Sequence, residues 1–282
     1  MTFRTRFAPS PTGPLHLGHA YSAILGHDLA RAEGGAFLLR MEDTDLQRCT
    51  PVYDALILED LTWLGLSWDG PVLRQSHQLA SYDSVLDQLA EADLLYPCSC
   101  SRRDIQAAQS APQEGALPSV YPGTCKNRLL SDRKPGDALR LHLDRALELF
   151  GSNLPQFVEE GDAHAGTHRL DSEAMLRQIG DIVLFRKSDE IVAYFLASCL
   201  DDHAQSITHV VRGEDLFDFT AIQVLLLSLL NLSIPIYHHH RLIRDEAGKR
   251  LAKRDDARAI SKYRQEGHSP ADLRSWIGLP KA

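Results

Sequence analysis

Two histidines three residues apart, His16 and His19, lie in the segment RFAPSPTGPLHLGH, which spans residues 6–19. Imidazole N–H groups donate hydrogen bonds to phosphate oxygens, and the unpaired amides of a first helical turn add partial positive charge. Three prolines stiffen the approach to this pair, and Gly18 lets a ligand come close to the backbone. A histidine pair at this spacing is often incidental, but its place at a helix start favours a nucleotide site.

Three thiols form a second group of residues with possible chemistry. Cys98 and Cys100 are separated by one residue, and Cys125 lies four residues after Tyr121. Thiols this close in sequence are typical of structural zinc, which requires a fourth ligand. Tyr121 is a poor generic ligand because a phenol titrates near pH 10, although a metal can lower that pKa. The spacing alone leaves open both a zinc site and a set of free thiols.

The histidine pair needs a scaffold, which the surrounding hydrophobic pattern predicts. Residues 3–8 read as a short buried strand, a helix starts at Leu17, and residues 36–41 read as a second buried strand. This order forms a right-handed parallel unit, and ligands bind beyond the carboxyl ends of such strands. The opening loop and Glu42, which follows the second strand, are therefore expected on one rim.

The pattern changes after Tyr96 and returns late in the chain. Parallel-sheet texture resumes in EIVAYFLASCLDD and continues in SITHVVRGEDL and IPIYHHHRLI. We therefore predict an α/β fold with a Rossmann-like, doubly wound parallel sheet built from residues 1–95 and 188–238. An inserted module is expected at 96–187, and a C-terminal segment at 239–282.

Composition bounds the class of protein. The chain has 282 residues, of which 44% are hydrophobic and 24% charged, as is ordinary for a soluble globular protein. No apolar run approaches the roughly 20 residues that a membrane helix needs. The start, MTFRTRF, lacks the apolar core of a secretory signal, and the five cysteines are an odd number. We predict a cytoplasmic protein with no membrane partner.

The charge distribution is uneven. The net charge is -8, yet residues 241–264 contain nine Lys or Arg against four Asp or Glu. A local basic segment on an acidic body could contact nucleic acid, although a solvated surface is the more common role of such a run.

Four separated segments carry a resemblance to a known family. HLGH resembles the HIGH signature of class I aminoacyl-tRNA synthetases. Together with LLRMEDTD, THVVRGEDL and RLIRDEAGKRLAKRDDA, in this order, it is similar to glutamyl-tRNA synthetases over nearly the whole chain. The resemblance implies a Rossmann-like catalytic domain that forms glutamyl-adenylate from L-glutamate and ATP, with Mg²⁺ accompanying the nucleotide.

The resemblance assigns the ATP side and the catalytic residues to His16, Gly18, His19 and Lys253. Lys253 aligns with the second lysine of the KMSKS loop, whereas Arg250 replaces the first lysine and Ala252 the serine. Arg250 keeps the charge, but the hydroxyl is lost. Because the substrate carboxylate itself attacks the α-phosphorus, catalysis depends on alignment and on stabilising charge at the phosphate.

The family pattern assigns glutamate binding to Arg6, Ala8, Ser10, Glu42, Tyr194 and Arg212. The charges suit that substrate, because an arginine fork can bind a carboxylate bidentately and Glu42 can hold the ammonium. The hydroxyl of Tyr194 can distinguish amino-acid substrates by the length of their side chains. Any one of these residues alone would more often be a structural ion pair or a core tyrosine.

A subgroup of short glutamyl-synthetase-like proteins carries the same Cys-x-Cys and Tyr-x-x-x-Cys arrangement with zinc. This likeness implies one structural Zn²⁺ on Cys98, Cys100, Tyr121 and Cys125. The chain stops soon after the KMSKS-like block, so no helical anticodon-binding region is expected in it.

The short form implies activation of glutamate without tRNA and transfer to the queuosine base in the anticodon loop of tRNA(Asp). The basic segment 241–264 would contact the RNA backbone, and a monomer is expected.

Two alternatives remain at this stage. The chain could be a truncated glutamyl-tRNA synthetase that charges a 3′ acceptor end, with the anticodon module on another chain. It could also be a catalytically silent paralogue that binds glutamate or RNA, an alternative that the altered KMSKS block keeps open.

Overall fold

The computed structural model describes residues 2–101, 103–105, 120–186, 191–244 and 258–280. Its first half contains three parallel strands in the order β1-β2-β3. These are β1 (Arg4–Phe7), β2 (Ala36–Met41) and β3 (Leu73–Arg74). Helix α1 (Leu17–Ala32) connects β1 to β2, so the expected strand–helix–strand unit is present.

The second half continues this parallel arrangement. Strand β9 (His209–Gly213) pairs in parallel with β10 (Ile236–His240), and α8 (Thr220–Leu229) lies between them in the chain. The amide of Thr208 donates to the carbonyl of Arg4 over 3.1 Å, which places β9 beside β1. The two halves therefore meet at β1 and β9, where the connections reverse direction and where such folds bind ligands.

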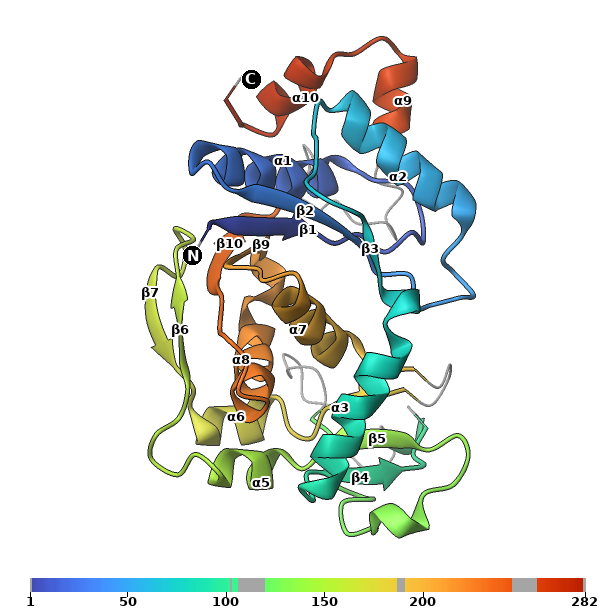
Figure 1. Ribbon diagram of the computed structural model, residues 1–282, viewed down its shortest axis with the longest axis vertical. Helices are drawn as coiled ribbons and strands as arrows, with labels where there is room; N and C mark the ends of the chain where they lie inside the picture. Colours follow the sequence, from blue (N-terminus) through green and yellow to red (C-terminus); the bar gives the residue numbers. More distant parts are fainter. Residues whose placement is uncertain (1, 102, 106–119, 187–190, 245–257, 281–282) are drawn as a thin grey trace.

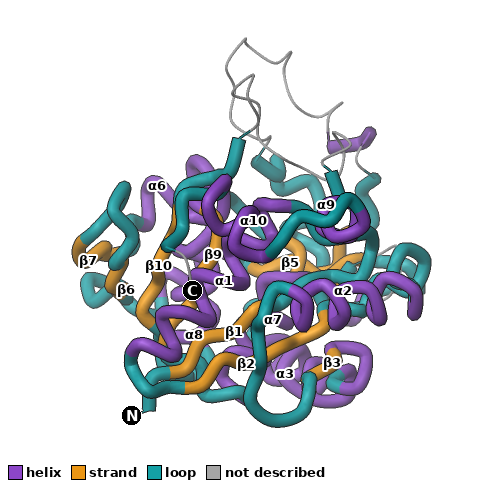
Figure 2. Tube along the Cα trace, turned by 90° about the horizontal axis from the view of Figure 1, so that it is seen from above, coloured by secondary structure: helices purple, strands orange, loops and turns teal. Residues whose placement is uncertain are grey.

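Helices cover both sides of these strands (Figure 1). Helices α1 and α2 (Pro51–Trp63) share one hydrophobic cluster with α9 (Ile260–Gln265) and α10 (Pro270–Trp276). A second cluster on the other side contains α3 (Leu79–Glu91), α7 (Tyr194–Ala204) and α8. Figure 1 shows α9 and α10 at the top of the molecule, and Figure 2 views the same end from above. The α/β class with a parallel sheet is confirmed.

A separate antiparallel sheet is formed by residues that lie between β3 and β9 in the sequence. It consists of β4 (Leu95–Cys98), β5 (Ala138–Leu141) and β8 (Val183–Phe185), in that order. Helices α5 (Leu143–Glu148) and α6 (Ser172–Gln178) follow within the same part of the sequence. Three short 3₁₀ turns complete the described elements, at Gln75–His77, Leu130–Asp132 and Glu214–Phe219.

The segment 96–187 is not structurally uniform. Its strand β6 (Gln156–Glu159) pairs in parallel with β10, and β7 (Gly166–Arg169) pairs antiparallel with β6. This hairpin therefore extends the sheet that contains β9 and β10, whereas β4, β5 and β8 form a separate sheet. The proposed boundary at 238/239 likewise falls inside β10.

One sequence-based expectation about the secondary structure is wrong. The stretch EIVAYFLASCLDD, interpreted as parallel-sheet texture, forms most of α7. Leu196, Ala197 and Cys199 are all buried, so this helix is apolar around much of its circumference and lacks the clear stripe of a surface helix. Within the described ranges, none of the helices combines the length and apolarity that crossing a membrane requires.

Candidate active site and cysteine cluster

The two histidines of the opening loop form the N-terminal cap of α1. The Nδ1 atom of His16 accepts from the amide of Gly18 over 3.1 Å, and the amide of His16 donates to Nδ1 of His19 over 3.1 Å. A ring nitrogen that accepts an N–H carries no proton, so each neutral ring carries its proton on Nε2. The ring centroids lie 3.8 Å apart. The loop therefore holds two Nε2–H donors side by side at a helix N-terminus.

Gly18 packs tightly against this cap. A Cβ atom at Gly18 would lie 3.0 Å from Cε1 of His16, so a larger residue would require the imidazole to shift by a few tenths of an ångström.

The chain that flanks the basic block packs beside this loop. The amide of Ile260 donates to the carbonyl of Leu15 over 2.8 Å, and Ile243 belongs to the same hydrophobic cluster as Leu15. Lys253, Arg250 and Ala252 themselves lie outside the described residues. The two described flanks, at Ile243 and Ile260, lie on the side of the fold where His16 and His19 lie.

A cavity of about 210 Å³ opens where the loop meets the end of β2. The amide of Glu42 donates to the carbonyl of Pro9 over 3.0 Å and so joins the two segments. Ser10, Glu42 and Tyr194, three of the six predicted glutamate-binding residues, line this cavity. The other lining residues are Thr12, Thr44, Asp45, Arg48, Gln75, Arg186, Val192 and Ala197. Ala8, Arg6 and Arg212 do not belong to the lining.

Arg6 is buried beneath this cavity in a network of charges. Its Nε atom donates to Asp202 over 2.9 Å. The fully buried Arg40 donates to the same carboxylate over 2.7 Å and lies 3.6 Å from Asp201 and 3.5 Å from Glu42. Asp201 also accepts hydrogen bonds from side chains of α3 and the turn before it, Tyr82 at 2.7 Å and Gln75 at 2.8 Å.

The carboxylates of this network outnumber its cations. Glu42, Asp201 and Asp202 face two guanidinium groups, those of Arg6 and Arg40, which leaves one excess negative charge when all are ionised. Burial is the main cause that raises the pKa of Glu42 to about 7, against the opposing effect of the arginines. Glu42 is therefore the carboxylate that stands to gain from a cation entering the cavity.

Tyr194 lies close enough to this network and to Arg212 to be affected by their charges. The residue is 38% exposed, and desolvation raises the pKa of its hydroxyl. The charges of Arg212, Glu42 and Arg6 all act on that hydroxyl. The predicted residues thus converge on one region, although the two arginines lie below its surface.

Arg212 is already hydrogen-bonded inside the protein. It donates from Nε to His239 over 2.9 Å, from Nη1 to Gln223 over 2.5 Å, and from Nη2 to Thr220 over 2.9 Å. The expected bidentate contact with a substrate would use an N–H not engaged here or displace a neutral acceptor such as Gln223. That contact stays a prediction.

Several residues that build the site were missed in the sequence. Arg40 stands inside the apolar strand AFLLRM and Asp202 ends the apolar run of α7. A charged residue within a buried element almost always has a partner, and this signal alone could have identified both. Their mutual pairing could not be foreseen, because they are separated by 162 positions.

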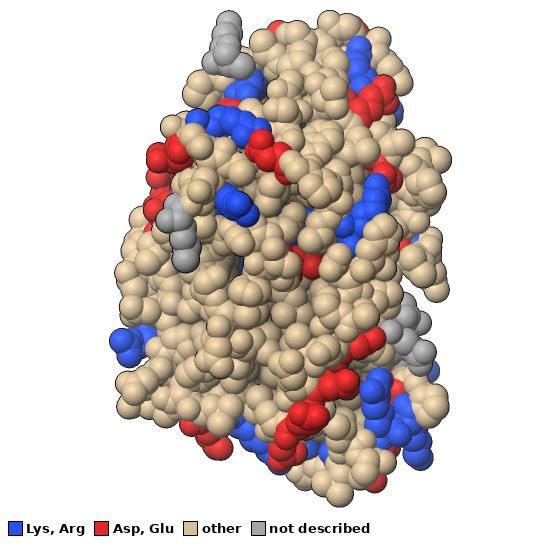
Figure 3. All heavy atoms as spheres, viewed as in Figure 1, with Lys and Arg blue, Asp and Glu red and all other residues tan. Residues whose placement is uncertain are grey.

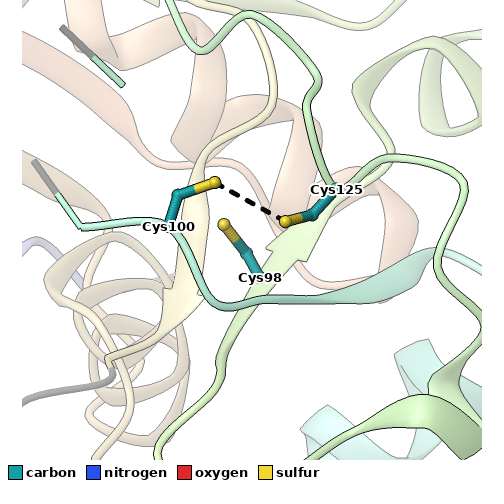
Figure 4. A group of neighbouring side chains, drawn as sticks. All are labelled: Cys98, Cys100 and Cys125. Carbon is teal, nitrogen blue, oxygen red and sulfur yellow. Dashed lines mark hydrogen bonds between the residues drawn. The ribbon is translucent and has the colours of Figure 1, made fainter. Parts of the chain in front are cut away.

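The three predicted thiols come together in the antiparallel module (Figure 4). The sulfur atoms of Cys98, Cys100 and Cys125 all lie within 4.8 Å of one another. The hydroxyl of Tyr121 is 3.4 Å from Sγ of Cys98 and 3.5 Å from Sγ of Cys100. Three sulfurs and one oxygen therefore face a common centre, as tetrahedral zinc requires.

The environment of the cluster favours the anionic form of Cys125, whereas burial raises the pKa of Cys100 and of Tyr121. Burial alone would raise the pKa of Cys125, but hydrogen bonds from Tyr121 and its other neighbours lower it to about 6. The guanidinium carbon of Arg140 lies 3.7 Å from the ring centroid of Tyr121. These donor atoms fit a structural metal ion, and none of the four residues lines the cavity beside Glu42.

Two arginines in the described part of the basic segment pair with acidic residues of the protein itself. Arg258 forms an ion pair with Glu266, and Arg264 lies 3.0 Å from Glu59. On the face shown in Figure 3, acidic side chains form a row over α3, whose exposed carboxylates are Asp83, Asp87 and Glu91. The surface over α3 is therefore unfavourable for a polyanion such as RNA.

Comparison with known protein families places these features in context. Residues 2–280 match the catalytic-domain model of the class I tRNA synthetases of the E and Q group. The glutamyl-Q tRNA(Asp) synthetase of Rhodobacter capsulatus is 56% identical, covering 98% of this chain and 99% of the relative. The glutamyl-Q tRNA(Asp) synthetase of Nocardia farcinica is 41% identical, covering 98% of this chain and 85% of the relative.

Solved structures show the same fold. A glutamate tRNA ligase from Elizabethkingia meningosepticum, crystallised with its amino acid, superposes with a TM-score of 0.73 at 28% identity. The match covers 96% of this chain but only 59% of that ligase, so the chain spans less than two thirds of its length. Mycobacterium tuberculosis methionyl-tRNA synthetase is similar in fold alone, with a TM-score of 0.62 at 11% identity.

Proposed function

The chain belongs to the class I tRNA synthetases of the E and Q group, and we propose that it activates glutamate with ATP and transfers it to tRNA(Asp). It is a ligase. The observation that carries the proposal is the 56% identity to a glutamyl-Q tRNA(Asp) synthetase over nearly the full length of both chains. The cavity beside His16, His19 and Glu42 supplies a matching site.

We propose that adenylate formation relies on positioning. The α-carboxylate oxygen of glutamate bonds to the α-phosphorus of ATP while the bond to pyrophosphate breaks, so the protein supplies no nucleophile. The Nε2–H groups of His16 and His19 would stabilise negative charge on the transferring phosphate, with Gly18 allowing its approach and Lys253 adding a cation. Mg²⁺ would enter with ATP and neutralise phosphate charge.

The charges around the cavity support glutamate as the amino acid. The excess negative charge near Glu42 would attract the substrate ammonium. Arg212 would hold a carboxylate in concert with Tyr194, while Arg6 would contribute its charge from beneath. Ser10 and the backbone near Ala8 would border the bound amino acid. These residue roles are proposals for this chain.

We further propose one structural Zn²⁺ held by Cys98, Cys100, Tyr121 and Cys125. The ion would tie the loop after β4 to the segment that precedes β5. The convergence of three sulfurs and a phenol oxygen supports this assignment, since zinc is bound tetrahedrally by such ligands.

The acceptor is proposed to be the queuosine base of tRNA(Asp), as the names of the relatives suggest. RNA loops are commonly read through splayed single bases, which suits a reaction on one modified base. The acidic row over α3 argues that the RNA approaches another face. Monomeric state, cytoplasmic location and glutamate activation without tRNA stay predictions.

One experiment tests the function directly. The protein is incubated with ATP and labelled glutamate, first alone to measure ATP–pyrophosphate exchange, then with queuosine-containing or queuosine-lacking tRNA(Asp). We expect exchange without RNA and label only on the queuosine-containing tRNA, stable to removal of the 3′ adenosine.

The alternatives give different results. Label on the 3′ adenosine would indicate a synthetase that charges the acceptor end. Exchange that requires tRNA would contradict RNA-independent activation. A protein that binds glutamate but shows neither exchange nor transfer would be the silent paralogue.

A further inference from the structure

A buried chain of hydrogen bonds connects Arg212 to two residues that lie outside the cavity lining. We infer that His239 and Glu159 are positioning residues, which hold the guanidinium of Arg212 in the orientation that receives a carboxylate of glutamate. The inference rests on the proposed role of Arg212 in substrate binding. It concerns how that arginine is held.

The hydrogen bonds define the protonation state of His239. Its Nε2 atom accepts from Nε of Arg212 over 2.9 Å, so this nitrogen carries no proton. The proton is therefore on Nδ1, which donates to Oε2 of Glu159 over 2.5 Å. The hydrogen bonds therefore connect a carboxylate, a neutral imidazole and a guanidinium in that order, and each bond has one donor and one acceptor.

The carboxylate at the end of this chain is held firmly. Its other oxygen, Oε1, accepts from the backbone amides of His239 and Gly161, each over 2.7 Å. Hydrogen bonds from His239 and these amides outweigh burial and lower the pKa of Glu159 to about 2. The side chains of Glu159 and His239 are both fully buried.

The fold fixes the spacing of the three residues. Glu159, His239 and Arg212 come from the adjacent strands β6, β10 and β9, and His239 is in register with Arg212. A Cβ atom at Gly161 would lie 2.1 Å from the carbonyl oxygen of His239, so only glycine permits this close approach. The strands therefore leave little freedom for the imidazole.

The arrangement has a chemical advantage over direct pairing. Arg6 is bonded directly to the carboxylate of Asp202, which neutralises much of its charge. The three side-chain partners of Arg212 are instead neutral: an imidazole, the amide of Gln223 and the hydroxyl of Thr220. The charge of Glu159 balances that of Arg212 through the imidazole of His239 and not by direct contact. This arrangement orients the guanidinium and leaves it able to attract a substrate carboxylate.

The same geometry makes the link sensitive to acid. Burial lowers the pKa of His239; Glu159 opposes this shift, and the charges of Arg212 and His164 add to it. The ring is therefore neutral at neutral pH. When it is protonated at lower pH, its Nε2–H would face the Nε–H of Arg212, and the hydrogen bond would be lost.

Two variants of His239 separate its two hydrogen bonds. In His239→Gln the amide oxygen can replace Nε2 and accept from Arg212, whereas in His239→Asn the shorter amide can reach only toward Glu159. We expect His239→Asn to raise the KM for glutamate in ATP–pyrophosphate exchange about tenfold, and His239→Gln to stay within about threefold of the parent. The KM for ATP should stay within twofold in both.

Three further variants complete the test. His142→Asn changes another buried histidine, in the antiparallel module, and should leave both KM values unchanged whatever its effect on stability. Glu159→Gln should raise the KM for glutamate and alter its pH profile in the acid range. Arg212→Ala reports on the premise and should raise that KM more than any of these.

The results distinguish the role of Arg212 in glutamate binding from the positioning roles of His239 and Glu159. If Arg212→Ala leaves the KM for glutamate unchanged, the proposed role of Arg212 is wrong. If Arg212→Ala raises it but folded His239→Asn and Glu159→Gln do not, the positioning inference is overturned. Equal effects of the two His239 variants, spread over both KM values, would reduce His239 to a structural residue. If His239→Asn fails to fold, the KM and pH profile of Glu159→Gln decide the question.

Discussion

The cavity lined by Glu42 and the cysteine cluster both gather ionisable groups, but they stabilise them by different means. Around the cavity, carboxylates and guanidinium groups from distant parts of the chain pair with each other. In the cluster, three thiols and a phenol share hydrogen bonds among themselves. The first region is ordered by the protein's own charges, and the second has the donor set of a metal site.

This difference indicates which kind of substitution would destabilise each region. A buried ion-pair network fails when one partner is removed, because the others stay buried without compensation. A metal cluster fails when a ligand or the ion is removed, and its loss should be confined to the module that it ties together. The predictions below test this contrast, beginning with the largest expected effect.

Arg40→Met should break the network beneath the cavity. It leaves Asp201, Asp202 and Glu42 without the cation that lies between them, and removing one partner of a buried pair costs about 3–5 kcal/mol. Urea denaturation measures the loss. Arg177→Met, which removes an exposed pair with Glu173, is the matched control and should change stability by less than about 0.5 kcal/mol. Equal losses in the two variants would contradict the contrast.

Cys98→Ser should remove the metal from the cluster. Loss of a supporting group around a metal typically costs 10–100-fold in affinity, so loss of a direct ligand should cost more than about 100-fold, or about 2.7 kcal/mol. Metal analysis of the purified proteins checks this, with one zinc per chain expected in the parent. Cys49→Ser, which changes a thiol outside the cluster, should retain the metal. A parent protein that never contains zinc would refute the assignment.

Glutamate binding should weaken as the pH falls through about 7. Burial raises the pKa of Glu42 to about 7, so below this pH the carboxyl group is protonated and loses its attraction for the substrate ammonium. The KM for glutamate should rise about tenfold from about pH 8 to about pH 6, or about 1.4 kcal/mol. Glu42→Gln should show a high KM with no change in this window. A flat profile in the parent would remove Glu42 from the ammonium site.

Tyr121→Phe should weaken the cluster less than Cys98→Ser does. It removes the phenol oxygen but keeps the ring that lies against Arg140 and the three thiols. We expect zinc affinity to fall by about tenfold, or about 1.4 kcal/mol, because water can take the fourth position. Competition with a chelator measures the change. An effect as large as that of Cys98→Ser would mean that the phenol is needed to assemble the cluster.

Much of the site followed from local pattern. A short strand, a stiff loop and a helix start at Leu17 were enough to predict that His16 and His19 would lie at a helix start beyond the end of a strand. The cysteine spacing made a cluster of Cys98, Cys100 and Cys125 one of two open interpretations, and the structure brings the three together. In both cases the interacting residues are close in sequence, so loop length alone limits how far apart they can lie.

The long-range parts of the site did not follow in this way. Arg40 and Asp202 meet across 162 positions, and Glu159 meets His239 across 80. The apolar stretch of α7 also reads equally well as a buried strand, because periodicity disappears where every side of an element is covered.

The sequence by itself determined the family, the class of fold and which residue types could bind phosphate, a dicarboxylic amino acid and a metal. Tertiary structure alone decided that Arg6 and Arg212 are anchored from below, one by a carboxylate and the other through an imidazole. The physical reason is that burial and pairing of charge depend on which strands become neighbours. Strand order joins residues that no local pattern connects.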